Sequence, residues 1–309
     1  MSARLLDGRA VAAEIRGEAA RETAAFRERT GVTPRLVMIL AGEDPASVVY
    51  TRNKAKAAEE SGIGADLITL PVSVTAAALR SQIASLNADP GVHGILVQLP
   101  LPSEIDAAVV TEAIDPVKDV DGVHPVNAGR LAAGRPGFVP CTPAGIMELL
   151  RRSGIPVAGR EAIVLGRSAI VGRPMAALLT AADATVTVAH SKTQDLESVT
   201  RRGEILVAAI GRAAAIGKRH IRPGATVVDV GINRCTSAAD AAVYFPGQPE
   251  RLDEIRRRGH TLVGDVHPAE GAEAAGAITP VPGGIGPLTI AMLLLNTLKA
   301  ARGLAGERV

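Results

Sequence analysis

A short apolar run, a glycine-bounded turn and a helix within residues 161–174 (EAIVLGRSAIVGRP) constrain the fold most strongly. Ala162–Leu165 has the pattern of a buried strand, and Gly166 and Gly172 bound the turn before an apolar helix at 175–180. These elements begin a βαβ unit, in which the helix N-terminus presents free N–H groups to a phosphate. The glycines stand six residues apart and do not match G-x-G-x-x-G. This stretch alone leaves a dinucleotide site and an ordinary tight turn equally open.

The strand that follows favours NADP over NAD. Residues 184–189 (ATVTVA) alternate like a strand, and Ser191 and Lys192 come next, with no acidic residue before Asp195. In a Rossmann unit an acidic residue at this strand end binds the ribose 2′-hydroxyl of NAD and repels the 2′-phosphate of NADP. A hydroxyl and a lysine, with Arg167 in the preceding turn, suit a phosphate dianion instead. We therefore expect NADP, and an ordinary solvated loop is the alternative for Ser191 and Lys192.

Composition limits the classes of function that fit this chain. A length of 309 residues suffices for two domains with separate cores. A net charge of +2 and an aromatic content of 2% argue against nucleic-acid or membrane binding. Cys141 and Cys235 have neither metal-ligand spacing nor a disulfide pattern, which is typical of a reducing compartment. The N-terminal segment contains acids and lacks the apolar core of a signal peptide, so we expect a soluble cytoplasmic protein.

The first half of the chain alternates between helices and strands. Apolar periodicity predicts helices at 8–29, 45–60 and 75–87 and strands at 35–40, 65–70 and 94–99. This alternation implies a parallel sheet with right-handed crossovers. A Pro/Gly-rich region, 115–140, then interrupts the pattern, and Thr142 begins a helix to Arg152 that we expect to cross between domains.

The second half repeats the alternation. It predicts a five-stranded Rossmann-like sheet from strands at 162–165, 185–189, 205–209, 226–230 and 261–264. We interpret residues 235–260 as a surface excursion with one short helix. Pro287 suits the first position of a final helix ending near Ala301, which is too apolar to stand alone. We expect this helix to pack back on the first domain.

The predicted fold is therefore α/β with two domains. Residues 1–142 plus 285–309 are expected to form an N-terminal α/β domain with a parallel sheet. Residues 143–284 are expected to form a Rossmann-like NADP-binding domain.

Three polar side chains stand out in the first half. Tyr50 and Lys54 are four residues apart and share one face of a predicted helix. A lysine beside apolar surface loses proton affinity and can act as a base, whereas a solvated lysine cannot do so at neutral pH. Gln98 is the polar residue near the end of the apolar strand GILVQLPLP, at the edge where α/β proteins bind ligands. A solvated lysine and a backbone-satisfied glutamine are the structural alternatives.

An acidic pair lies in the turn-rich stretch PVKDVDGVHPVN. Either Asp119 or Asp121 offers a carboxylate that can bind an aminopyrimidinone through two parallel hydrogen bonds, and turn capping is the alternative. These aspartates and His124 do not form a recognised metal-ligand set. His267 has no H-x-x-x-H partner, so we interpret it as structural and predict no metal.

These motifs together resemble the bifunctional methylenetetrahydrofolate dehydrogenase/cyclohydrolase family. The resemblance runs nearly end to end through Tyr50-x-x-x-Lys54, GILVQLPLP, KDVDGVHPVNAGRL, PCTPAGI, GRSAIVGRP, HSKT, DVGIN and TPVPGGIGP. Only the insert at 235–260 is longer than the family pattern.

The resemblance implies roles for particular residues. Tyr50 would stack on the aminobenzoyl part of a folate, Lys54 would be the acid/base group oriented by Gln98, and Asp121 would hold the pterin. Pro282, Gly283 and Gly284 would shape the wall between folate and cofactor. The NADP-binding residues implied by the family pattern are Gly166, Arg167, Ser168, Ser191 and Ile232.

The resemblance also implies an activity in one-carbon metabolism. The enzyme would oxidise 5,10-methylenetetrahydrofolate with NADP to the 5,10-methenyl form and then hydrolyse this product to 10-formyltetrahydrofolate. The family pattern also implies a homodimer in which the N-terminal domain binds the folate. One alternative is an NADP-dependent dehydrogenase of another small metabolite, of the shikimate type, which leaves Tyr50 and Gln98 without a role. Another is a non-catalytic nucleotide-binding protein, against which the intact Lys54, Gln98 and Asp121 argue.

Overall fold

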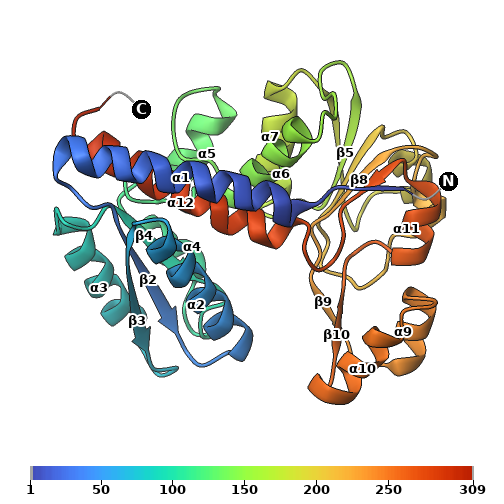
Figure 1. The fold of residues 1–309 in the computed structure, drawn as a ribbon, viewed down its shortest axis with the longest axis horizontal. Helices are drawn as coiled ribbons and strands as arrows, with labels where there is room; N and C mark the ends of the chain where they lie inside the picture. Colours follow the sequence, from blue (N-terminus) through green and yellow to red (C-terminus); the bar gives the residue numbers. More distant parts are fainter. Residues whose placement is uncertain (1–2, 308–309) are drawn as a thin grey trace. The chain divides into compact units, whose positions relative to one another are not determined.

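The computed structural model describes residues 3–307 as two compact units (Figure 1). The first unit comprises Ala12–Cys141 and Thr289–Val309, and the second comprises Met1–Val11 and Thr142–Leu288. Both units contain parallel sheets flanked by helices, so the predicted α/β class is confirmed. No helix within residues 3–307 is long and apolar enough to cross a lipid bilayer.

The first unit is built on a three-stranded parallel sheet. Its order is β3 (Gly64–Leu70), β2 (Arg35–Ala41) and β4 (Gly94–Gln98), so β2 lies in the centre. The sequence RLVMILA explains this position, because every residue of β2 after Arg35 is buried, as a strand covered on both faces requires. The predicted parallel sheet is confirmed.

Capping residues determine where two helices of this unit begin. Asp44 accepts a hydrogen bond from the Ser47 amide (2.8 Å), and Pro45 occupies the first helical turn, so α2 begins there. Thr75 caps α3 in the same way. The helices of this unit are α2 (Pro45–Glu60), α3 (Ala76–Ala88), α4 (Ala107–Glu112), α5 (Pro125–Ala132) and the larger parts of α1 (Gly8–Thr30) and α12 (Ile285–Leu304).

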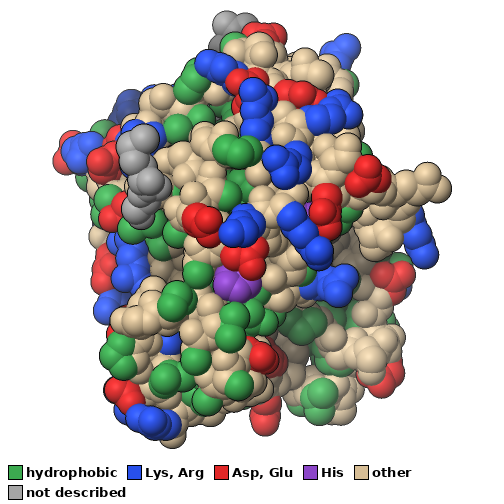
Figure 2. All heavy atoms as spheres, turned by 90° about the vertical axis from the view of Figure 1, so that its right-hand side faces the viewer, with side chains coloured by type: hydrophobic (Ala, Val, Ile, Leu, Met, Phe, Trp, Pro, Cys, Tyr) green, Lys and Arg blue, Asp and Glu red, His purple; other side chains and the backbone are tan. Residues whose placement is uncertain are grey.

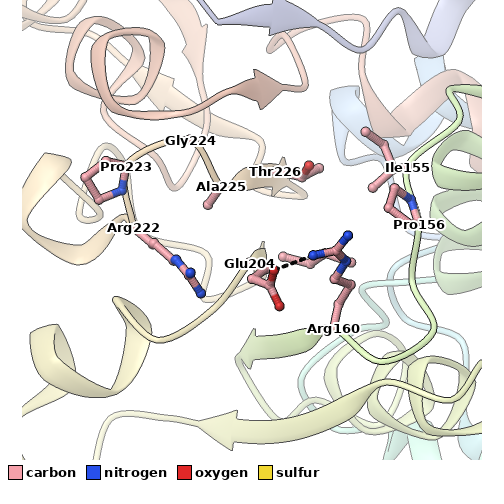
Figure 3. A pocket seen from close by; sticks show the side chains of 10 residues that line it. Ile155, Pro156, Arg160, Glu204, Arg222, Pro223, Gly224, Ala225 and Thr226 are labelled. Carbon is pink, nitrogen blue, oxygen red and sulfur yellow. Dashed lines mark hydrogen bonds and ion pairs between the residues drawn. The ribbon is translucent and has the colours of Figure 1, made fainter.

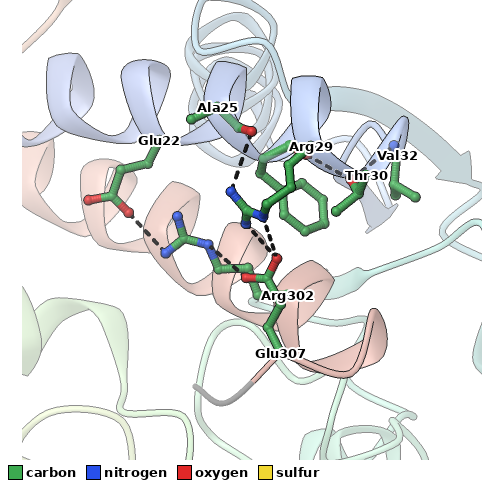
Figure 4. A network of polar contacts seen from close by, with 8 residues as sticks. Glu22, Ala25, Arg29, Thr30, Val32, Arg302 and Glu307 are labelled. Carbon is green, nitrogen blue, oxygen red and sulfur yellow. Dashed lines mark hydrogen bonds and ion pairs between the residues drawn. The ribbon is translucent and has the colours of Figure 1, made fainter.

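The final helix packs on the first unit, as predicted. Leu293 and Leu294 of α12 are buried in one apolar cluster with Leu36 and Met38 of β2. Helices α1 and α12 lie side by side in this unit (Figure 1). Charged groups join their ends, where Arg302 pairs with Glu22 (3.1 Å) and also contacts Glu307 (Figure 4).

The second unit contains a six-stranded parallel sheet. Its order is β1 (Arg4–Leu5), β11 (Ala277–Ile278), β8 (Thr226–Asp229), β7 (Ile205–Ala208), β5 (Glu161–Leu165) and β6 (Thr185–Ala189). Apolar runs such as ILVA in β7 are buried along their whole length. Neither β1 nor β11 was predicted, because two residues carry no periodicity and both residues of β1 are exposed.

One predicted strand lies elsewhere. Residues 261–264 were expected in the Rossmann-like sheet, but β10 (Thr261–Val263) pairs antiparallel with β9 (Asn233–Cys235) in a separate two-stranded sheet. The insert between these strands contains two helices, α9 (Ala238–Tyr244) and α10 (Pro249–Arg258), where one was predicted. The apolar run TLV indicates a strand but cannot specify its partner, which explains the error.

The second unit also carries helices on its sheet and mixed charge on its surface. Besides α9 and α10, its helices are α6 (Cys141–Arg152), α7 (Gly172–Ala181), α8 (Leu196–Thr200), α11 (Pro268–Ala274) and a 3-10 turn at Lys218–His220. Figure 2 shows basic and acidic side chains intermixed over one face of this unit. Exposed ion pairs such as Lys218–Glu273 (3.3 Å) have this mixed character.

Candidate active site

A buried lysine is the centre of the site in the first unit. Lys54 is 5% exposed because it lies on the core-facing stripe of α2, together with Thr51 and Ala58. Its Nζ donates a hydrogen bond to Gln98 Oε1 (3.0 Å) and lies 4.6 Å from the centre of the Tyr50 ring. The structure therefore brings together the three side chains that were singled out in the first half of the sequence.

Gln98 is held in one orientation. It ends β4, and its Nε2 donates to the carbonyl of Leu99 (2.6 Å), which precedes a cis peptide bond to Pro100. The amide oxygen therefore faces Lys54, because the flipped amide would oppose an NH₂ group to the ammonium. Gln98 is both an acceptor for Lys54 and a fixed part of the strand end.

The surroundings of Lys54 disfavour its charged form. Burial lowers the pKa of Lys54, and the negative charge of Asp121 only partly opposes this effect. Burial also raises the pKa of the Tyr50 hydroxyl, which hydrogen-bonds Thr289. The site thus holds an amine that gives up its proton more readily than a solvated lysine and a phenol that keeps its proton.

The two predicted acidic candidates have different roles. Asp119 is fully buried, and its carboxylate accepts hydrogen bonds from the amides of Val123 (3.2 Å) and His124 (2.8 Å) and from Asn127 Nδ2 (2.8 Å). Asp119 is therefore the turn-capping residue. Asp121 is half-buried and is the carboxylate that acts electrostatically on Lys54 and Tyr50.

Sequence reasoning missed the groups that hold Asp121 in place. The buried Cys141 thiol hydrogen-bonds the Asp121 side chain and contacts the Val120 carbonyl (3.3 Å). Asn296 of α12 donates to the carbonyls of Val120 (2.8 Å) and Val139 (3.2 Å). A polar Asn inside the apolar run IAMLLLNTL was the signal that indicated a buried hydrogen-bonding role.

The predicted phosphate turn of the second unit leaves little room for side chains. Gly166 has φ +125°, and a Cβ there would overlap the carbonyl oxygen of Ala209. A Cβ at Gly172 would overlap the carbonyl oxygen of Gly166. Ser168 Oγ accepts the amides of Val171 (3.2 Å) and Gly172 (3.3 Å) at the start of α7. Such a close-packed turn before a helix N-terminus fits a dinucleotide pyrophosphate.

The other predicted cofactor residues follow strands of the same sheet. Leu165 at the end of β5 pairs with Ala189 at the end of β6, so Arg167 and Ser191 emerge at one sheet edge. Both are exposed, as is Ile232 (62%), which follows β8. The structure thus places these three residues on segments that leave the carboxyl edge of the sheet, where α/β proteins bind nucleotides.

The Pro/Gly turn before α12 is tightly packed. Val281–Pro282 is a cis peptide bond, and Gly283 has φ +110°. A Cβ at Gly283 would lie 2.9 Å from Arg9 Nε, and one at Gly284 would lie 2.7 Å from the Pro280 carbonyl oxygen. Pro282 and Gly283 belong to the second unit, whereas Tyr50, Lys54, Gln98 and Asp121 belong to the first.

The remaining histidine candidates are structural. The ring nitrogens of His124 and His267 cap α5 and α11 by accepting the amides of Val126 (3.0 Å) and Glu270 (3.4 Å). Among residues 3–307, no group of three or more His, Cys, Asp or Glu side chains is arranged to bind a metal ion.

One cavity of the second unit lies away from the predicted residues. It has a volume of about 280 Å³ and is lined by residues at the amino ends of β7 and β8 (Figure 3). Two of the lining residues, Arg160 and Glu204, form an ion pair (2.7 Å). This edge is opposite to the one that binds ligands in α/β sheets, so we do not include the cavity in the site.

Comparison with known families decides between the interpretations left open by the sequence. Residues 6–121 match the model of the tetrahydrofolate dehydrogenase/cyclohydrolase catalytic domain, and residues 140–304 match that of the NAD(P)-binding domain. The chain belongs to this family. The resemblance inferred from the motifs is confirmed, and the shikimate-type alternative loses its support.

Close relatives match over the full length. The bifunctional protein FolD of Koribacter versatilis (strain Ellin345) is 53% identical over 309 residues, covering 100% of both chains. The FolD protein of Acidiphilium cryptum (strain JF-5) is 54% identical over 301 residues, covering 97% of this chain and 99% of that one.

Solved structures agree with the fold. The bifunctional enzyme FolD from Campylobacter jejuni has a TM-score of 0.88 at 42% identity and covers 98% of this chain and 99% of its own. The Trypanosoma brucei FolD, complexed with NADP cofactor and an inhibitor, has a TM-score of 0.88 at 40% identity, with 98% of each chain covered.

Proposed function

We propose that this protein oxidises 5,10-methylenetetrahydrofolate with NADP and hydrolyses the 5,10-methenyl product to 10-formyltetrahydrofolate. The observation that carries the proposal is the buried Lys54 amine, with Gln98 as its acceptor and the Tyr50 ring beside it. These residues stand in the region that matches the catalytic domain of the family.

Two side chains of the first unit are proposed to bind the folate directly. The Tyr50 ring stacks on the aminobenzoyl part of the substrate, and the Asp121 carboxylate accepts two parallel hydrogen bonds from the pterin. Cys141 and Asn296 hold the Asp121 segment in place through the contacts described above. Orientation of this kind contributes to rate by keeping the reacting carbon at one position.

The residues of the phosphate turn fit NADP. The close-packed turn of Gly166 and Gly172, with Ser168 at the start of α7, would hold the pyrophosphate, and Arg167 and Ser191 would bind the 2′-phosphate. Ile232, which is exposed and follows β8, would be a further contact of the cofactor. When bound, NADP supplies the acceptor for the hydride that leaves the methylene carbon.

Lys54 performs the proton transfers of hydrolysis. A water molecule adds to the methenyl carbon and passes one proton to the neutral amine. The bond from this carbon to N5 then breaks, and the Lys54 ammonium returns its proton to N5. The second water proton leaves as the formyl C=O forms, so hydrolysis releases one proton overall. Gln98 holds the amine in position through both transfers.

A comparison of ligands and activities tests this function. We expect folates, and not shikimate, to raise the unfolding temperature, and we expect 5,10-methenyltetrahydrofolate to be hydrolysed without added NADP. Binding of NADP with no turnover of either folate would contradict the proposal and favour the non-catalytic alternative.

We also propose that the protein acts as a cytoplasmic homodimer in one-carbon metabolism. The free, buried Cys141 and Cys235 support a reducing compartment, and the family resemblance supports the dimer. In this proposal, the first unit binds the folate and the second unit binds NADP. Light scattering of the purified protein checks the dimer, and cell fractionation checks the compartment.

A further inference from the structure

Two buried carboxylates in the second unit take no part in the proposed chemistry. Asp229 ends β8 and is 4% exposed, and Asp265 follows β10 and is fully buried. The hydrogen bonds that these carboxylates accept come from amide groups. A buried carboxylate is costly unless several donors stabilise it, so such a pair calls for an explanation.

Asp265 joins two loops. Its Oδ2 accepts the backbone amides of Ile210 (2.6 Å) and Gly211 (3.0 Å). Its Oδ1 accepts the amide of Arg212 (2.9 Å) and Asn233 Nδ2 (3.0 Å). Three successive amides after β7 and one side chain after β8 therefore converge on a single carboxylate.

Asp229 in turn holds Asp265. Its Oδ1 accepts the amides of Gly231 (3.0 Å) and Asp265 (2.8 Å), and its Oδ2 accepts the amide of Val266 (2.9 Å). A Cβ at Gly231 would overlap Asp265, and a Cβ at Gly264 would overlap Asp229. Both glycines are therefore required for this close packing of the loops around the two carboxylates.

The loop held by Asp265 lies beside the proposed phosphate turn. Strand β5 has β6 on one side and β7 on the other, so the strand order reverses between β5 and β7. Dinucleotides bind in the crevice at such a reversal. Ala209 lies directly before the held loop, and its amide donates a hydrogen bond to the carbonyl of Leu165 (2.8 Å). The carbonyl of Ala209 leaves no room for a side chain at Gly166. The 210–212 loop thus adjoins the NADP crevice.

We propose that Asp265 is a positioning residue for NADP binding and that Asp229 supports it. Asp265 fixes the 210–212 loop and Asn233, next to Ile232, before the cofactor arrives, so binding does not have to order these segments. This proposal rests on the proposed function only in naming NADP as the ligand of this crevice.

The test replaces Asp265 by Asn, which keeps the shape of the side chain. One carboxylate oxygen that accepts hydrogen bonds from amides becomes an NH₂ group, so the 210–212 loop loses some of the hydrogen bonds that hold it. We expect the Kd for NADPH, measured by nicotinamide fluorescence, to rise about tenfold in D265N. Hydrolysis of 5,10-methenyltetrahydrofolate without NADP, which uses Lys54 in the first unit, is expected to stay within about twofold.

Controls separate positioning from general destabilisation. Asp240→Asn alters an exposed aspartate of the same unit and is expected to leave the Kd for NADPH unchanged. A D265N protein with a lowered unfolding temperature but an unchanged Kd for NADPH would overturn the proposal. If D265N does not fold, Asn233→Ala removes a single donor to Asp265, and an unchanged Kd in that variant would also overturn it.

NADPH binding and folate turnover by the wild-type protein distinguish this proposal from the proposed function. NADPH binding without folate turnover would contradict the proposed function and leave the role of Asp265 standing. Failure of the wild-type protein to bind NADPH would overturn both.

Discussion

Lys54 Nζ lies 3.0 Å from Gln98 Oε1, which joins the buried face of α2 to the end of β4. Burial lowers the pKa of this amine, while the charge of Asp121 moderates the effect. The proposed base for hydrolysis must be able to lose its proton near neutral pH, which burial favours, and the hydrogen bond to Gln98 orients the amine.

Replacing Lys54 with Met removes the amine and keeps an unbranched side chain of similar length. We expect hydrolysis of 5,10-methenyltetrahydrofolate to fall by about 100-fold or more. The unfolding temperature at pH 7 should not fall, because a buried charge is replaced by an apolar group. Lys56→Met is the matched control, since Lys56 is 76% exposed and pairs only loosely with Glu60 (3.8 Å). Unchanged hydrolysis in folded K54M would remove Lys54 from the mechanism.

Substitutions at Gln98 are expected to move the pH dependence of hydrolysis in opposite directions. A carboxylate in Gln98→Glu stabilises the ammonium and raises the pKa of Lys54, so the neutral amine appears only at higher pH. Gln98→Met removes the acceptor from Nζ and lowers the pKa of Lys54 further. The pH–rate profile of methenyl hydrolysis measures both displacements. Displacements in the same direction, or none, would contradict the role given to Gln98.

Arg167 is expected to select NADP over NAD. Its guanidinium is exposed at the sheet edge from which Ser191 also emerges, and it suits the 2′-phosphate. Arg167→Ala should raise KM for NADP by about 10- to 100-fold and leave KM for NAD nearly unchanged. Arg201→Ala removes another exposed arginine of this unit as a control. Equal losses for the two cofactors would show that Arg167 does not bind the 2′-phosphate.

Asp229 should make stability depend on pH. Burial raises the pKa of Asp229 to about 7, whereas an unfolded aspartate has a pKa of about 3.9. Between these values the folded state binds more protons, so the contribution of Asp229 to the free energy of unfolding falls as pH rises. Asp229→Asn lacks this titration. Urea unfolding should therefore show the variant gaining stability relative to wild type between pH 5 and pH 8, and a constant difference would contradict the prediction.

Much of the architecture was predictable because apolar periodicity and caps agree along the chain. The strand before Gly166, the buried strand ending near Gln98 and the helix begun by Asp44 and Pro45 all appear in the structure. The edge strand Arg4–Leu5 could not be predicted, since it depends on a partner far along the chain. The same reason explains why β10 was assigned to the wrong sheet.

The residues of the candidate site were predictable in part, but several of their contacts were not. Tyr50, Lys54 and Gln98 stand out as residue types in apolar surroundings, and the structure joins them. Sequence alone left Asp119 and Asp121 equivalent, because only the fold shows that three donors already occupy Asp119. The contact of Cys141 with Asp121 likewise depends on how the chain returns after residues 122–140.

Turnover of 5,10-methylenetetrahydrofolate with NADP+ tests the proposed function most directly, with NADPH and the methenyl intermediate followed together. We predict that NADPH forms with little accumulation of methenyl compound, because the proposed mechanism has Lys54 assist its hydrolysis in the same site. In K54M the same experiment should give NADPH together with a lasting methenyl pool if hydride transfer survives. Failure of the wild-type protein to reduce NADP+ would contradict the proposed function.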